Sequence, residues 1–289
     1  MKNSYLALAH AGKNDWWRYW WGMLLILVIW IYGGGLFTLG FVKLAFQSIE
    51  TANPLALYTT EKIQDLFTVL AVFLTLKWLH GREVSTLFSV EGRLNLKRFC
   101  LSTVVWLLLT LLPVLGIWLF DPSKYASDFN LRQLFILLLV IVMTAFQSAE
   151  EELVFRGYLL QGINSFTSQP FIAVCLSSLV FAYGHFLNLL YIPLEDLSSF
   201  AWYFVFGVFA SILTLRDNRI ELAMGVHTAT NLSFFLLVKS ADSPFTTAII
   251  KQTSDSQGIS EAWFVAMMAI FYSIFFLVPR KSNLRGLND

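Results

Sequence analysis

The sequence predicts an all-α, polytopic membrane protein with about eight transmembrane helices. Of its 289 residues, 57% are hydrophobic and only 13% are charged, whereas a typical soluble domain has roughly 25% charged residues. The apolar residues form continuous runs and do not alternate with polar ones, which disfavours a β-barrel. A water-soluble globule could not bury so much apolar surface, so we place the chain in a membrane.

Eight apolar segments are long enough to cross the bilayer as helices, since a crossing takes about 20 residues and the backbone must satisfy its own hydrogen bonds in lipid. In chain order they are Trp20–Val42, Ile63–Leu79, Phe99–Phe120, Leu131–Leu160, Phe171–Leu190, Leu197–Leu215, Leu222–Val238 and Ala262–Val278. We divide the chain into an N-terminal arm (1–19), a first group of three helices (20–120), a core of helices four to seven (131–238), an eighth helix (262–278) and a tail (279–289).

Lysine and arginine residues near the segment ends predict the orientation, because basic loops stay in the cytoplasm. They gather in the arm, after the second segment, after the sixth and in the tail, at Lys2, Lys13, Arg18, Lys77, Arg82, Arg93, Lys97, Arg98, Arg216, Arg219, Arg280, Lys281 and Arg285. With eight helices these four stretches fall on one side, so we expect both termini in the cytoplasm. The first apolar segment should remain as an anchor, since it is longer than the apolar part of a signal peptide.

Three apolar segments are interrupted by polar side chains, which are costly in a bilayer and are therefore functional candidates. Those in the fourth, fifth and seventh segments are Glu150, Glu151, Glu152, Arg156, His185, Asn188, His227 and Asn231. Glu152 and Arg156 are four residues apart with the acid first, the favourable order for an ion pair. Glu151 points about 100° away from Glu152, so the arginine does not neutralise it.

The depth of these groups in the bilayer tests whether they can meet. If the fourth helix ended at Ser148, Glu151 would lie at the cytoplasmic edge and His185 roughly 20 Å deeper, at about 1.5 Å per residue. If the helix continues to Leu160, Glu151 lies roughly 13 Å inside, at a depth comparable to that of His227. The sequence therefore predicts one helix through Leu131–Leu160, and a carboxylate, two imidazoles and an amide that converge in one cavity.

Each of these features, taken alone, also fits a purely structural role. A run of three glutamates followed by arginine is typical of a solvated helix end, and an intramembrane histidine often hydrogen bonds a neighbouring helix. The functional interpretation depends on three polar groups that interrupt three different apolar segments.

Taken in order, the motifs Glu151-Glu152-x-x-x-Arg156, Phe181-x-x-x-His185 and His227-x-x-x-Asn231 resemble the motif series of the CPBP family. This family comprises CAAX-processing endoproteases and bacteriocin-processing or self-immunity membrane proteins, and it is also called the Abi family. The matching region runs from about Leu131 to Val238. The resemblance implies an intramembrane peptidase of glutamic or metallo type in a bacterial inner membrane.

The resemblance also implies roles for the motif residues. Glu151 would act with His185 to activate water, and His227 and Asn231 would stabilise the oxyanion. The supporting residues would be Glu152, Arg156 and Phe181. The substrate would be a peptide or a small membrane protein.

The sequence says less about cofactors and partners than about the catalytic residues. The helical zinc signature HExxH is absent, so we expect no cofactor, although Glu151, His185 and His227 form a donor set that zinc accepts. The chain has 20 basic and 19 acidic residues, a balance that does not favour nucleic-acid binding. Apart from its substrate, the partner we expect is the lipid bilayer.

Two other classes of function use the same features. A non-proteolytic adaptor or bacteriocin-immunity protein would bind a partner through the same cavity. A proton-coupled transporter would use buried glutamate and histidine as a relay, but the sequence shows no inverted repeat.

Overall fold

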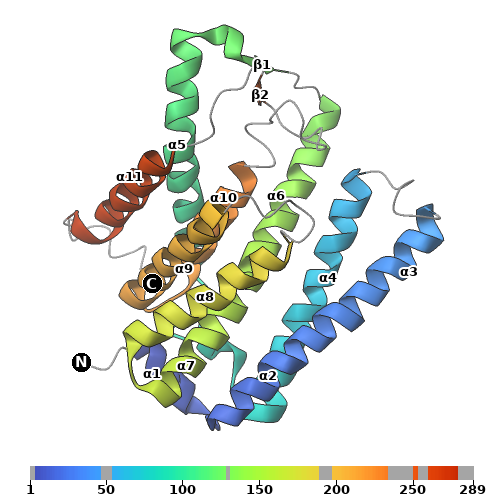
Figure 1. The fold of residues 1–289 in the computed structure, drawn as a ribbon, viewed down its shortest axis with the longest axis vertical. Helices are drawn as coiled ribbons and strands as arrows, with labels where there is room; N and C mark the ends of the chain where they lie inside the picture. Colours follow the sequence, from blue (N-terminus) through green and yellow to red (C-terminus); the bar gives the residue numbers. More distant parts are fainter. Residues whose placement is uncertain are drawn as a thin grey trace.

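The computed structural model describes residues 4–46, 54–127, 131–188, 197–233, 250–252 and 260–278. These residues form a bundle of helices (Figure 1). The helices are α1 (Ser4–Ala7), α2 (Trp16–Val28), α3 (Gly35–Phe46), α4 (Pro54–Thr75), α5 (Leu96–Phe120), α6 (Leu131–Glu152), α7 (Leu160–Thr167), α8 (Pro170–Asn188), α9 (Leu197–Asp217), α10 (Glu221–Leu232) and α11 (Glu261–Tyr272). The predicted all-α class is confirmed.

Single turns of tighter or wider helix connect or extend these elements. The 3₁₀ turns are Leu8–Ala11, Val84–Leu87 and Pro122–Lys124, and the π-helical turns are Ile29–Gly34, Leu76–His80, Leu153–Leu159 and Ser273–Leu277. Two short strands that the sequence did not predict, β1 (Tyr125–Ser127) and β2 (Ile250–Gln252), pair antiparallel at one end of the bundle (Figure 1).

The apolar helices make the chain an integral membrane protein. Among the described residues, the helices long and apolar enough to cross a bilayer are Trp16–Ala45, Lys62–His80, Leu96–Phe120 and Phe200–Asp217, and shorter apolar helices lie at Pro170–His185 and Glu261–Leu277. Large apolar side chains face outward, among them Phe120 and Leu44 with 94% and 90% of their surfaces exposed. The predicted count of eight spans stays a prediction, and the predicted tail lies outside the described residues.

The helix that carries the glutamates runs through the middle of the bundle (Figure 1). Its backbone is helical from Leu131 to Thr167, because α6 continues through the π-helical turn Leu153–Leu159 into α7. The prediction of one helix through Leu160 is therefore confirmed. Single π-helical turns inside α-helices occur frequently at functional sites, and this one contains Arg156.

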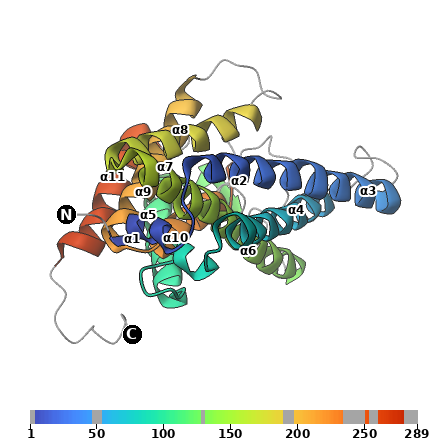
Figure 2. The same cartoon turned by 90° about the horizontal axis from the view of Figure 1, so that it is seen from below.

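The neighbours of α6 determine what faces Glu151. Helix α10 packs against both α5 and α6, α4 packs against α6, and α8 packs against α9. Seen from below, α2 and α3 lie along α4 on one side of the bundle, while α8 and α9 lie on the other side of α6 (Figure 2). The interior between these two sides holds the candidate site.

Helix α10 is held closely against α5. A Cβ atom on Gly225 would lie 2.5 Å from Cβ of Ser102 and 2.7 Å from the carbonyl oxygen of Phe99, so the backbones approach as only glycine allows. Ser102 Oγ donates a hydrogen bond to the carbonyl oxygen of Leu222 at 2.7 Å. These contacts fix the position of His227, which lies two residues after Gly225.

The N-terminal residues pack into the bundle. Tyr5 is fully buried, and its hydroxyl donates a hydrogen bond to the carbonyl oxygen of Leu87 at 2.5 Å. The same hydroxyl lies 3.4 Å from the carbonyl oxygen of Arg156. The first long helix begins at Trp16, four residues before the predicted segment, so part of the predicted arm belongs to the bundle.

Candidate active site

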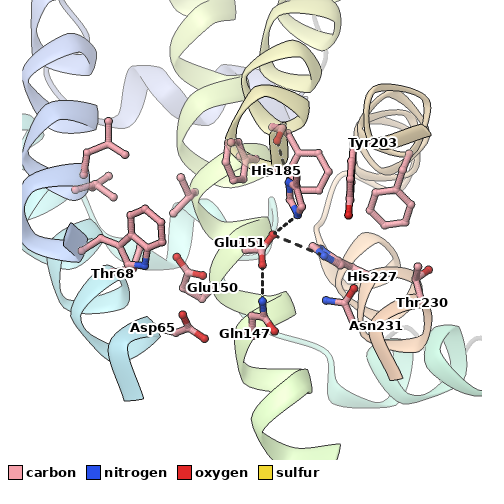
Figure 3. Close-up of a pocket in the computed structure, with 18 of the residues that line it drawn as sticks. Asp65, Thr68, Gln147, Glu150, Glu151, His185, Tyr203, His227, Thr230 and Asn231 are labelled. Carbon is pink, nitrogen blue, oxygen red and sulfur yellow. Dashed lines mark hydrogen bonds and ion pairs between the residues drawn. The ribbon is translucent and has the colours of Figure 1, made fainter. Parts of the chain in front are cut away.

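Glu151 is the penultimate residue of α6, and its carboxylate is at the centre of the site (Figure 3). Its Oε2 atom is 3.7 Å from Nε2 of His185 and 3.7 Å from Nε2 of His227. Gln147, one turn earlier on α6, donates a hydrogen bond from Nε2 to Oε1 of Glu151 at 3.0 Å. One carboxylate oxygen is thus held by the amide, and the other faces both imidazoles.

His185 comes from α8 and has a defined tautomer. Its Nδ1 atom lies 2.9 Å from the carbonyl oxygen of Phe181, and because a carbonyl can only accept, Nδ1 carries the hydrogen. In the neutral ring Nε2 therefore presents a lone pair to Glu151. The ring contacts Phe181, with 4.4 Å between the two centroids, and stacks on Tyr203, at 4.3 Å and an interplanar angle of 26°.

His227 comes from α10 and is oriented by Glu152. Its Nδ1 atom lies 2.8 Å from Oε1 of Glu152, and the same oxygen accepts a hydrogen bond from Nη1 of Arg156 at 2.9 Å. Glu152 and Arg156 are almost completely buried, and the guanidinium also lies 4.4 Å from the centre of the Phe181 ring. Because an ionised carboxylate only accepts, neutral His227 also presents a lone pair on Nε2.

Asn231 lies one turn after His227 on α10. Its Nδ2 atom donates to Oγ of Ser148 at 3.4 Å, which leaves a second N–H of the amide for another acceptor. The structure therefore brings Glu151, His185, His227 and Asn231 together from three helices. Their roles stay predictions.

A cavity of about 790 Å³ lies over this group and extends to both sides of the bundle. On one side α2, the turn after it and α4 supply Met23, Ile26, Leu27, Trp30, Asp65 and Thr68. On the other side α9 supplies Trp202, Tyr203 and Phe206. Glu150 also lines the cavity, on the side of α6 that faces Asp65 of α4 (Figure 3).

The sequence reasoning missed several of these residues. It did not predict the hydrogen bond between Glu152 and His227, which are 75 positions apart, or the stacking of Tyr203 on His185. Helical spacing reports neighbours on one helix only, and aromatic residues are common in every span. The sequence feature that could have indicated the α4 side of the cavity was Asp65, an acidic residue inside an apolar segment.

The possible zinc ligands can be compared with the observed geometry. Both Nε2 atoms face the same oxygen of Glu151, and each imidazole is oriented through Nδ1 as metal ligands commonly are. As the side chains stand, however, the part of the chain that the structure describes contains no group of three or more His, Cys, Asp or Glu side chains positioned to hold a metal ion.

Comparisons with known proteins agree with the motif pattern. Residues 132–233 match the model of the family described as type II CAAX prenyl endopeptidase Rce1-like, which confirms the resemblance. The chain is also 25% identical over 249 residues to the uncharacterized protein YyaK of Bacillus subtilis (strain 168). The aligned region covers 81% of this chain and 82% of that protein. No solved structure matches the chain.

Proposed function

We propose, from the Rce1-like match over residues 132–233, that the protein is an intramembrane endopeptidase that hydrolyses a peptide bond near the membrane. The family match supports a function of the intramembrane-protease type. The observation that carries the proposed chemistry is the position of Glu151 Oε2, 3.7 Å from the Nε2 atoms of both His185 and His227.

The spacing of these atoms favours a water molecule between them. A distance of 3.7 Å is too long for a direct hydrogen bond and is suitable for a water-mediated one. The water would donate one hydrogen to Glu151 Oε2 and the other to the lone pair on His185 Nε2, which leaves its oxygen free to attack. During the attack Glu151 takes the proton as general base, and it then passes this proton to the departing amine.

The oxyanion of the tetrahedral intermediate would face α10. Asn231 has an amide N–H that Ser148 does not use, so it can donate to the oxyanion. His227 can donate from Nε2 only when its ring carries a second proton. Glu152 is placed to stabilise that cation through Nδ1, and Arg156 holds the carboxylate of Glu152 in position.

The surroundings support a substrate that lies in the membrane. The side of the cavity formed by α2 is apolar, with Met23, Ile26 and Leu27, so we propose that it receives the apolar part of a peptide or small membrane protein. We place the protein in a bacterial inner membrane with both termini in the cytoplasm.

The test is hydrolysis of quenched fluorescent peptides and of membrane-anchored peptides by the full chain purified in detergent. We expect cleavage by the wild type, and losses of at least about 10²-fold in Glu151→Gln, His185→Ala and His227→Ala. Glu261→Gln, at the exposed start of α11, serves as the matched control. Undiminished cleavage by all three variants refutes the proposed site.

Two further experiments distinguish this proposal from a metallopeptidase and from a non-proteolytic protein. Loss of cleavage in EDTA, with recovery on adding Zn²⁺, would favour a metallopeptidase over a glutamic peptidase. A cellular phenotype that survives Glu151→Gln would favour a non-proteolytic adaptor or immunity protein, because this change preserves shape and removes the base.

A further inference from the structure

The hydrogen-bond donors of the site are fewer than the motif pattern suggests. Both imidazoles carry their hydrogen on Nδ1, His185 toward the carbonyl of Phe181 and His227 toward Glu152. In the neutral state neither ring can donate from the Nε2 atom that faces the cavity. Of the predicted oxyanion pair, only the amide of Asn231 then donates, whereas known oxyanion sites usually combine two or more donors.

Two other polar groups of the cavity are partly or wholly engaged. Gln147 donates one side-chain N–H to Glu151 and retains the second. Thr230 donates its hydroxyl to the carbonyl of Val226 and accepts from Trp106. A hydroxyl on a different helix would add a donor to the amide of Asn231.

Tyr203 on α9 carries a hydroxyl of this kind. It lines the cavity, and its ring stacks on His185 at 4.3 Å. In Figure 3 its hydroxyl end is directed toward His227. Within the described residues this hydroxyl has no hydrogen-bond partner, so its hydrogen is available to a ligand in the cavity.

We propose that Tyr203 is a further catalytic residue whose hydroxyl donates a hydrogen bond to the oxyanion, together with Asn231. This inference rests on the proposed peptidase function. The same residue also positions His185, because its ring stacks on one face of the imidazole at 4.3 Å. No proton leaves Tyr203 in the reaction, since the hydroxyl stabilises charge and is not a general acid.

Two substitutions separate the hydroxyl from the ring. Tyr203→Phe keeps the stacking and removes the donor, so we expect kcat to fall about 10²-fold with KM nearly unchanged. Tyr203→Leu also removes the stacking, so we expect a larger loss. Tyr32→Phe is the matched control, because Tyr32 is 62% exposed and lies outside the cavity.

A third variant tests donation directly. With 3,5-difluorotyrosine at position 203, the hydroxyl ionises at lower pH, so the alkaline limb of the rate profile should move to lower pH. A purely structural role would leave that limb in place.

The outcomes distinguish this inference from the proposed function. Cleavage that requires Glu151 but is retained within twofold in Tyr203→Phe overturns the role of Tyr203 and leaves the peptidase intact. An alkaline limb that stays in place with difluorotyrosine also overturns it. Absence of any cleavage by the wild type overturns both proposals.

Discussion

Oε1 of Glu152 lies 2.8 Å from Nδ1 of His227, although the two residues are 75 positions apart in the chain. The same oxygen accepts from Arg156 at 2.9 Å, and the exposed fractions of the two charged side chains are 0% and 1%. A residue on α10 is thereby fixed to the helix that carries Glu151. The relationship couples the stability of the fold to the geometry of the site.

The first prediction follows from the burial of this pair. Glu152→Ala leaves Arg156 as an unpaired buried charge, which should destabilise the fold by about 3–5 kcal/mol. The double variant Glu152→Leu with Arg156→Leu removes both charges and should recover most of that loss. Activity should stay low in both, because His227 has lost the group that orients it.

Thermal unfolding in detergent and the peptide assay check this prediction together. A double variant no more stable than the single one would show that the unpaired charge of Arg156 does not cause the destabilisation. A double variant with wild-type activity would contradict the orienting role of Glu152.

The second prediction concerns the close contact of α10 with α5. Gly225→Ala places a methyl group 2.5 Å from Cβ of Ser102, so we expect about 1–3 kcal/mol of destabilisation from overpacking. We also expect reduced activity, because His227 lies on the next part of the same helix. Gly116→Ala on α5 is the control, since no atom lies within 4 Å of its added Cβ. Equal stability of the two variants would contradict the close packing of α10 on α5 at Gly225.

The third prediction concerns the N-terminal residues. Tyr5→Phe removes a buried hydrogen bond to the carbonyl of Leu87 and should cost about 1–3 kcal/mol. Tyr32→Phe, at an exposed position, should leave the unfolding temperature unchanged. An unchanged melting temperature for Tyr5→Phe would show that this residue does not anchor the N-terminal segment.

The fourth prediction is the tautomer of His185. Because Nδ1 donates to the carbonyl of Phe181, ¹⁵N NMR of the labelled protein should show a protonated Nδ1 and an unprotonated Nε2 when the ring is neutral. The variant His185→Gln identifies the signal. The opposite tautomer would contradict the water position proposed above.

Much of this arrangement could be predicted from the sequence, and the reason is helical spacing. The extension of the fourth helix to Leu160 followed from the depth that Glu151 needed to reach. The pairing of Glu152 with Arg156 followed from their separation by four residues. Both inferences use only the geometry of a single helix.

The remaining features depend on packing between helices, which spacing does not report. Tyr203 looks like any aromatic residue of a span until α9 packs against α8. The burial of Tyr5 requires a turn near Leu87 to meet the N-terminus. The pairing of β1 with β2 joins Tyr125 to Gln252, which lie far apart in the chain, and neither strand has a distinctive pattern of its own.

The most direct measurement compares peptide cleavage by Glu151→Gln and Glu150→Gln in the same detergent preparation. The two residues are adjacent on α6, but Glu151 faces both imidazoles and Glu150 faces α4 (Figure 3). We predict that Glu151→Gln loses at least about 10²-fold in kcat while Glu150→Gln stays within about tenfold of the wild type. Equal activity of the two variants, or a greater loss in Glu150→Gln, would contradict the assignment of Glu151 as the base.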